Sequence, residues 1–129
     1  YGNHLDEDFL FVIVSDTIHQ IATEENCVIV GRCAEYILRD YPGMTSIFIR
    51  ADTDERVRRL CQSKEIQPAS ARKLLTTNDK RRAAFHDFYS SCQWGHASTY
   101  HLCINQSVLG MEATKSFVLD FVRRRYHLS

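Results

Sequence analysis

The sequence predicts an α/β fold in which helices flank a parallel sheet, and three features carry that prediction. Apolar residues recur at three- and four-residue steps between Asp8 and Glu25, which is typical of an amphipathic helix. Two short apolar runs, at residues 27–30 and 46–49, are bounded by turn residues and contain β-branched side chains, as buried parallel strands do. Helical segments alternate with these runs, which indicates crossover connections within a single domain spanning residues 1–129.

The rest of the sequence predicts four more helices or helical regions and one more strand. Asp52 or Thr53 is suited to cap a helix that continues to about residue 63. Pro68 favours the first turn of a long helical region that reaches about Tyr89, with a break near Asn78. The other predicted elements are a short helix at residues 33–40, a loop at 90–98, a third strand at 100–104 and a final helix at 111–125.

Composition places the chain among ordinary cytoplasmic proteins. No apolar run approaches the roughly 20 residues that cross a bilayer, so we expect no membrane partner. The acidic start YGNHLDEDF lacks the order of a signal peptide. The cysteines are odd in number and irregularly spaced, which argues against a disulfide framework and favours small buried residues. They are Cys27, Cys33, Cys61, Cys92 and Cys103.

Charge is balanced overall but concentrated in one segment. Residues 50–82 carry ten Lys or Arg and five Asp or Glu, whereas the remaining residues carry six basic and eleven acidic groups. A local excess of five positive charges suits a small anion such as a phosphate ester, or it is a solvated helix surface. A nucleic-acid groove would usually show a broader basic bias, so we expect no nucleic-acid partner.

A first candidate site follows the first apolar run, where the sequence reads Val30-Gly31-Arg32. In open parallel sheets, ligands bind just beyond the carboxyl ends of the strands. Gly31 lets the backbone turn there, and Arg32 can hold a phosphate or a base edge through two parallel N–H bonds.

A second candidate site is the basic segment NDKRRAAFHDFY at residues 78–89. On a helix, Asp79 and Arg82 lie three residues apart on one face. The segment is either an exposed helix with a local ion pair or a mobile basic flap that closes over transferring phosphates.

Together these segments resemble the cytidylate-kinase-like family. The run VIVGRCAEYILRDYPGMTSIFIRADTDERVRRLC is followed by the flap, by Trp94-Gly95, by YHLCIN at residues 100–105 and by LGME at residues 109–112. The resemblance extends from about residue 9 to residue 122, with its landmarks in order. It implies a P-loop kinase fold, with phosphoryl transfer from ATP and Mg²⁺ to a CMP- or dCMP-type acceptor.

The resemblance also implies roles for single residues. Gly31 and Arg32 match the acceptor-nucleotide site, and Asp79 and Arg82 match the catalytic flap, where the arginine neutralises charge on the transferred phosphoryl group. Arg56 and Arg59 match basic residues near the donor nucleotide. Ordinary cytidylate kinases have an Asp after the Gly-Arg pair, whereas Cys33 stands there in this chain. This departure leaves the base preference open.

A glycine-rich phosphate loop is the feature that this sequence lacks. A P-loop kinase uses such a turn to wrap the donor phosphates in backbone N–H groups. None of the five glycines, Gly2, Gly31, Gly43, Gly95 and Gly110, stands in that pattern. We therefore expect a partial P-loop kinase fold without its first strand and phosphate loop, equivalent to the C-terminal two thirds of the domain and inactive as an isolated chain. Whether it is a fragment or naturally lacks the loop stays open.

Two alternatives accompany the kinase interpretation. The first alternative is a non-catalytic nucleotide-binding or assembly module that keeps the kinase fold. We expect such a chain to self-associate through exposed sheet surface. Metal binding by Cys92, His96, His101 and Cys103 is a weaker hypothesis, because their spacing lacks the paired pattern of known zinc sites. The sequence alone therefore assigns no metal ligand.

Overall fold

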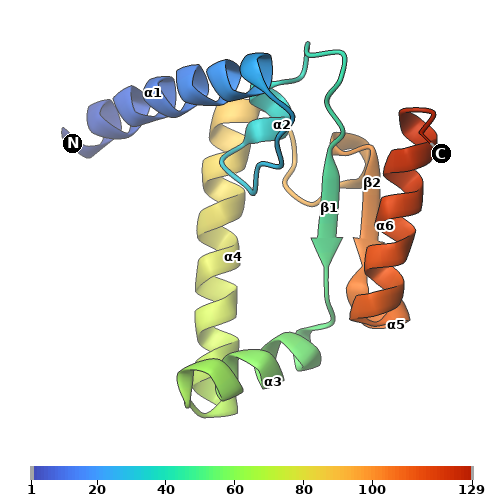
Figure 1. The fold of residues 1–129 in the computed structure, drawn as a ribbon. Helices are drawn as coiled ribbons and strands as arrows, with labels where there is room; N and C mark the ends of the chain where they lie inside the picture. Colours follow the sequence, from blue (N-terminus) through green and yellow to red (C-terminus); the bar gives the residue numbers. More distant parts are fainter. Residues whose placement is uncertain (1, 129) are drawn as a thin grey trace.

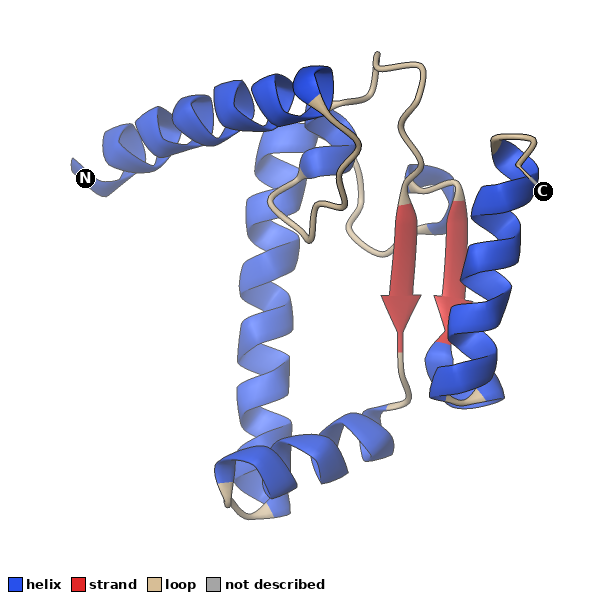
Figure 2. Ribbon diagram, viewed as in Figure 1, coloured by secondary structure: helices blue, strands red, loops and turns tan. Residues whose placement is uncertain are grey.

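Helices dominate the fold, and a small sheet forms one side of it. The computed structural model describes residues 2–128. In Figure 1, α1 lies across one end of α4 and α3 across the other, while the strands and α6 stand opposite α4. The mixed α/β class predicted from the sequence is confirmed (Figure 2). The elements are α1 (Gly2–Glu24), α2 (Ala34–Ile37), β1 (Ile47–Arg50), α3 (Thr53–Lys64), α4 (Pro68–Ser90), the 3-10 turn η1 (Ala97–Thr99), β2 (Leu102–Asn105), α5 (Gln106–Leu109) and α6 (Met111–Arg125).

The sheet of the described residues consists of β1 and β2. The two strands run parallel, with Ile47 opposite Leu102 and Arg50 opposite Asn105. The long connection between them holds α3 and α4, as a parallel pair requires. The sequence therefore correctly predicts both strands and their parallel direction.

The strand predicted at residues 27–30 is wrong. These residues have no regular secondary structure, and the side chains of Val28 and Val30 are 94% and 89% exposed. Among the described residues, β1 and β2 pair only with each other, so nothing offers this run a ladder of hydrogen bonds. Only Ile29 of the run packs against the core. Periodicity identifies an apolar run, but a strand also needs a neighbour to pair with.

The sequence predicts the bounds of two helices accurately. The bounds of α3 and α6 agree with the predicted 52–63 and 111–125. The break expected near Asn78 is wrong, because α4 runs without interruption from Pro68 to Ser90. An Asn inside a helix costs only a few tenths of a kcal/mol relative to good helix formers, which tertiary contacts easily override.

The core of the described residues lies where α1 covers α2. Its buried members are Ile18 and Ala22 of α1 with Ala34, Ile37 and Leu38 in and just after α2. Phe11, Val14, Ile29 and Met44 pack against them. The helical stripe predicted for residues 8–25 is thus only half buried, because Phe9 and Ile13 remain 67% and 46% exposed while Ile18 is 5% exposed.

The structure tests the sequence predictions about the cysteines and about membrane-spanning helices. All five thiols are free, and no disulfide joins any of these described residues. Cys33 is buried as predicted and Cys61 is partly buried, whereas Cys27, Cys92 and Cys103 are exposed, so burial is wrongly predicted for those three. Within residues 2–128 we find no helix that has both the length and the apolar composition for a bilayer crossing.

Candidate nucleotide site

A carboxylate on α4 binds two arginines from two different helices. Asp79 receives two hydrogen bonds from Arg56 of α3, Nη1 to Oδ2 at 2.7 Å and Nη2 to Oδ1 at 2.9 Å. Arg82, three residues further along α4, donates from Nη2 to the same Oδ1 at 2.6 Å. The side chains of Asp79 and Arg56 are 28% and 30% exposed, and that of Arg82 is 57% exposed. The predicted catalytic pair is thus brought together, and Arg56 joins it.

Electrostatics keep this cluster ionised. The hydrogen bonds from Arg56, followed by those from Arg82, hold the pKa of Asp79 below its usual range, although partial burial opposes them. The same carboxylate raises the pKa of Arg56, chiefly through its hydrogen bond. A bidentate arginine–carboxylate pair fixes both partners in one plane. We call Arg56, Asp79 and Arg82 the α3–α4 clamp.

Arg59 lies in a different network from Arg56. Its Nη2 donates to Gln106 Oε1 at 2.7 Å and to Glu55 Oε1 at 3.0 Å. Glu55 in turn accepts the hydroxyl of Ser107. Arg59 therefore ties α3 to α5, and the two arginines predicted as one donor-nucleotide group have separate partners.

The Gly31–Cys33 turn has an unusual backbone and lies beside α4. Gly31, Arg32 and Cys33 all have positive φ angles, of 71°, 60° and 60°. Such angles are uncommon for non-glycine residues and cluster at functional sites. The Cys33 Sγ lies 3.9 Å from the backbone oxygen of His86. This contact sets the turn beside α4 at His86, four residues, or about one helical turn, beyond Arg82.

Asp79, Arg82 and His86 therefore share one face of α4. Their spacing of three and four residues places them one above another along the helix, over about 10 Å. Arg32 follows directly from the chain that packs beside His86, and it is exposed. Among the described residues, it has no hydrogen-bond or ion-pair partner. The structure thus places the predicted acceptor arginine near the C-terminal half of the helix that carries the predicted flap.

The Trp-Gly pair anchors the loop after α4. The Trp94 N–H donates to Asp87 Oδ1 at 2.8 Å, and its ring meets that of Phe48 edge-on, with centroids 5.3 Å apart. Arg82 lies over the same ring, 5.6 Å from its centroid. A cation over an aromatic face is attracted by the ring quadrupole, so Trp94 helps to orient the arginine of the clamp.

Residue 95, next to this tryptophan, must be glycine because its backbone is left-handed and because the Phe48 ring leaves little room for a side chain. Its φ is +76°, and a Cβ added there would lie 3.1 Å from Phe48 Cζ. We expect Gly95→Ala to lower the free energy of unfolding by about 1–2 kcal/mol through backbone strain and crowding. Urea unfolding of both proteins measures the difference, and equal midpoints would contradict the expectation.

The metal hypothesis built on residues 92–103 does not match the structure. His101 Nδ1 accepts the N–H of Ser46 at 3.0 Å, and His96 Nδ1 accepts the N–H of Ser98 within η1. Among residues 2–128, the one group of three or more His, Cys, Asp and Glu side chains close enough to share an ion lies elsewhere, at Cys33, Glu35 and His86. The sequence analysis did not single out Glu35 or His86. The signal that could have found His86 is its spacing of seven from Asp79, which puts both on one helix face.

Two surface hollows in the described part of the chain lie away from the clamp. One is lined by His19, Ile37 and residues 39–42, and the other by Asp52, Asp54, Glu55, Arg58 and Ser107. Arg32, Asp79 and Arg82 line neither of them.

Comparison with known proteins identifies the family of this chain. The model of the cytidylate kinase-like family matches residues 1–108. The chain belongs to this family. It is therefore related to nucleotide kinases, and the resemblance inferred from the sequence is confirmed.

A solved structure supports the fold. It is described as an uncharacterized protein from Eubacterium ventriosum ATCC 27560, is 30% identical to this chain and superposes with a TM-score of 0.80. The match covers 88% of this chain and 63% of that protein, so the chain spans less than two thirds of its length. No curated protein matches the chain.

Proposed function

We propose that this chain forms the acceptor-nucleotide and flap portion of a pyrimidine nucleoside monophosphate kinase, which transfers a phosphoryl group from ATP and Mg²⁺ to CMP or dCMP. The observation that carries this proposal is that the α3–α4 clamp and the Gly31–Cys33 turn both contact α4, at Asp79 and at His86, in a chain related to nucleotide kinases. They bring Arg56 of α3, Arg82 of α4 and Arg32 of the turn to this helix. Phosphoryl transfer depends mainly on positioning and on neutralising charge, which are the tasks that arginines perform best.

Each side chain has a distinct task in this proposal. Arg32 is exposed and binds the phosphate of the acceptor monophosphate through two N–H donors. Arg82 is held by Asp79 and Trp94, so its guanidinium is oriented before the nucleotide arrives. Asp79 is the positioning residue for both Arg56 and Arg82, and Arg59 supports α3 from the α5 side. Orientation before binding lowers the entropic cost of the transition state.

The test is calorimetric titration of the chain with CMP, dCMP, UMP and inorganic phosphate. Wild-type protein is expected to bind CMP or dCMP more tightly than UMP or phosphate. Arg32→Ala is expected to weaken that binding at least tenfold, because a charged hydrogen bond contributes about 1.5–3 kcal/mol. Arg124→Ala is the matched control, since it removes an exposed arginine from α6 with the same change in charge.

The outcomes separate the proposal from its alternative. Equal affinity for all four ligands would indicate a general anion surface and would contradict an acceptor site. Absence of binding to any monophosphate would favour the assembly module. That alternative draws support from Asp79, whose carboxylate already neutralises Arg56 and Arg82 in this structure. Because the sequence contains no phosphate-loop pattern, the isolated chain is expected to bind CMP without turnover.

A further inference from the structure

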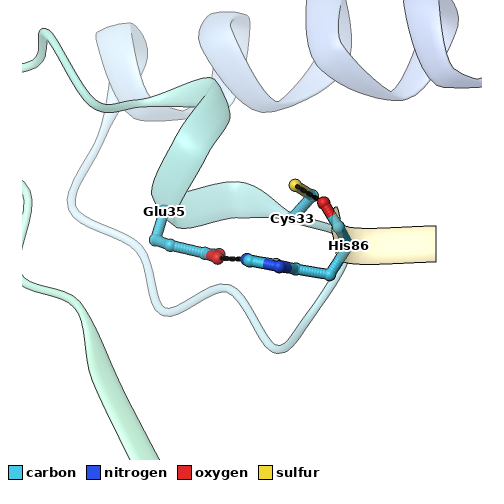
Figure 3. Close-up of side chains that lie close together, drawn as sticks. All are labelled: Cys33, Glu35 and His86. Atoms are coloured by element: carbon cyan, nitrogen blue, oxygen red, sulfur yellow. Dashed lines mark hydrogen bonds and ion pairs between the residues drawn. The ribbon is translucent and has the colours of Figure 1, made fainter. Parts of the chain in front are cut away.

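A buried cysteine, a glutamate and a histidine meet where the Gly31–Cys33 turn packs against α4. Figure 3 shows the Glu35 carboxylate at the ring of His86 and the Cys33 thiol at the backbone oxygen of His86. The Cys33 Sγ, a Glu35 carboxylate oxygen and a ring nitrogen of His86 all lie within 4.8 Å of one another. Cys33 and His86 are each 4% exposed, and the Glu35 side chain is 16% exposed.

We propose that Cys33, Glu35 and His86 form a binding site for a zinc-like divalent ion. Zinc bonds of about 2.0–2.3 Å place tetrahedral ligand atoms about 3.3–3.8 Å apart, so Glu35 and His86, which hydrogen-bond directly here, would separate to admit the ion. Thiolate, imidazole and carboxylate together are a donor set that zinc accepts and that Mg²⁺, which prefers oxygen, does not. Three protein ligands leave a fourth position for water or another group.

The surroundings of His86 match those of a metal-binding histidine. Its Nε2 faces Glu35 and the proposed ion, while its Nδ1 lies 3.1 Å from Asp87 Oδ1 and 3.3 Å from Ser90 Oγ. Histidine ligands usually donate their second ring N–H to a carboxylate or a similar acceptor, which fixes the tautomer and the ring orientation. Asp87 itself is held by the N–H of Trp94. The second nitrogen is therefore oriented, and the first is directed at the carboxylate of Glu35.

The backbone of the turn points the thiol into the cluster. Arg32 and Cys33 are consecutive non-glycine residues in the left-handed region, a conformation that persists only where the surroundings enforce it. Without an ion, Glu35 hydrogen-bonds directly to His86 and the thiol contacts the His86 carbonyl. Burial, followed by the charge of Glu35, raises the pKa of Cys33 to about 12, so the free thiol is protonated at neutral pH. Binding of the ion forms a zinc–sulfur bond and releases the thiol proton to solvent.

This inference does not depend on the proposed kinase activity, and it departs from the sequence analysis, which assigned no metal ligand. A bound ion would connect α2 to α4 through three side chains, next to Arg32. It would also be distinct from the Mg²⁺ that accompanies ATP, because that ion is held largely by phosphate oxygens.

The test is titration of chelator-treated protein with Zn²⁺ and with Co²⁺. We expect one equivalent of either ion to bind, and Co²⁺ to give a thiolate-to-metal charge-transfer band, which only a sulfur ligand produces. Cys33→Ser is expected to abolish that band and to weaken zinc binding at least tenfold. Glu35→Gln, which keeps a hydrogen-bonding partner for His86, is expected to weaken binding while leaving the band. Asp87→Asn is expected to weaken it about 10–100-fold through the orientation of His86.

One variant serves as a control. Cys92→Ser removes an exposed thiol outside the site, so it should bind zinc as wild type does. Absence of stoichiometric binding to the wild type would overturn the proposal, as would a cobalt band that survives in Cys33→Ser or disappears in Cys92→Ser. If Cys33→Ser does not fold, the Glu35→Gln and Asp87→Asn titrations decide in its place, and unchanged affinity in both would overturn the site.

Discussion

Replacing Asp79 with alanine is expected to lower the free energy of unfolding by about 2–3 kcal/mol. The substitution removes three charge-assisted hydrogen bonds and leaves Arg56, a side chain only 30% exposed, without its bidentate partner. The two bonds from Arg56 join α3 to α4 in the middle of a 23-residue helix. Urea unfolding monitored by circular dichroism measures the loss.

An exposed ion pair on α6 is the matched control for this prediction. Asp120 pairs with Arg124 at 2.8 Å, but the two side chains are 62% and 80% exposed. Exposed pairs four residues apart contribute about 0.3–0.5 kcal/mol, so Asp120→Ala should be close to neutral. Similar losses for Asp79→Ala and Asp120→Ala would show that the clamp is only another surface ion pair.

The clamp also predicts how stability depends on pH. The pKa of Asp79 is lower in the folded chain than its usual value of 3.8, chiefly because Arg56 donates to the carboxylate. The contribution of Asp79 is therefore fully present above the unfolded-state pKa and is lost as the pH falls through the lower folded-state pKa. The difference in stability between wild type and Asp79→Ala should be constant near neutral pH and shrink below about pH 4. A difference that persists undiminished into strong acid would contradict this linkage.

How much of the fold can be predicted depends on which interactions define each element. The bounds of α3 and α6 follow from local signals: Asp52 is the residue before α3, although its side chain makes no capping hydrogen bond, and Gly110 is the residue before α6. The run at residues 27–30 fails because a strand is defined by its neighbour, and Val28 is exposed where a buried strand was expected. The half-buried stripe of α1 fails similarly, since periodicity identifies an apolar face but not what covers it.

The candidate site is predictable where residues are close in sequence and less so where they are not. Asp79 and Arg82 are three residues apart, so their ion pair follows from helix geometry. Arg56 reaches Asp79 across 23 positions, and the sequence assigned the two to different groups, Arg56 to the donor nucleotide and Asp79 to the flap. The contact of Glu35 with His86 spans 51 positions and no motif includes it, so only the packing of α2 against α4 makes it visible.

Replacing Ile18 with alanine is expected to have the largest effect on stability, a loss of about 2–4 kcal/mol. Ile18 is 5% exposed and contributes to the buried cluster with Ala22, Ala34, Ile37 and Leu38. Removing a buried isoleucine side chain costs its transfer free energy together with that of the cavity left behind. Denaturant unfolding measures the loss.

Ile13 is the matched control for Ile18, because it has the same side chain in the same helix but is 46% exposed. Ile13→Ala should cost less than about 0.5 kcal/mol, since alanine is also the better helix former. Equal losses would mean that the apolar stripe is buried along its whole length, as the sequence pattern alone predicts.

The same substitution tests whether α1 supports the candidate site. The helix α2 has only four residues, far fewer than a helix needs to be stable alone, so its position depends on packing against α1. Hydrogen exchange in Ile18→Ala should therefore rise in the amides of residues 34–38 more than in those of α6, which has no member in the buried cluster. Arg32 and Cys33 directly precede α2, so CMP and zinc binding should weaken in Ile18→Ala and stay unchanged in Ile13→Ala. Increased exchange of equal size in α2 and α6 would instead indicate global unfolding, with no particular dependence of the site on α1.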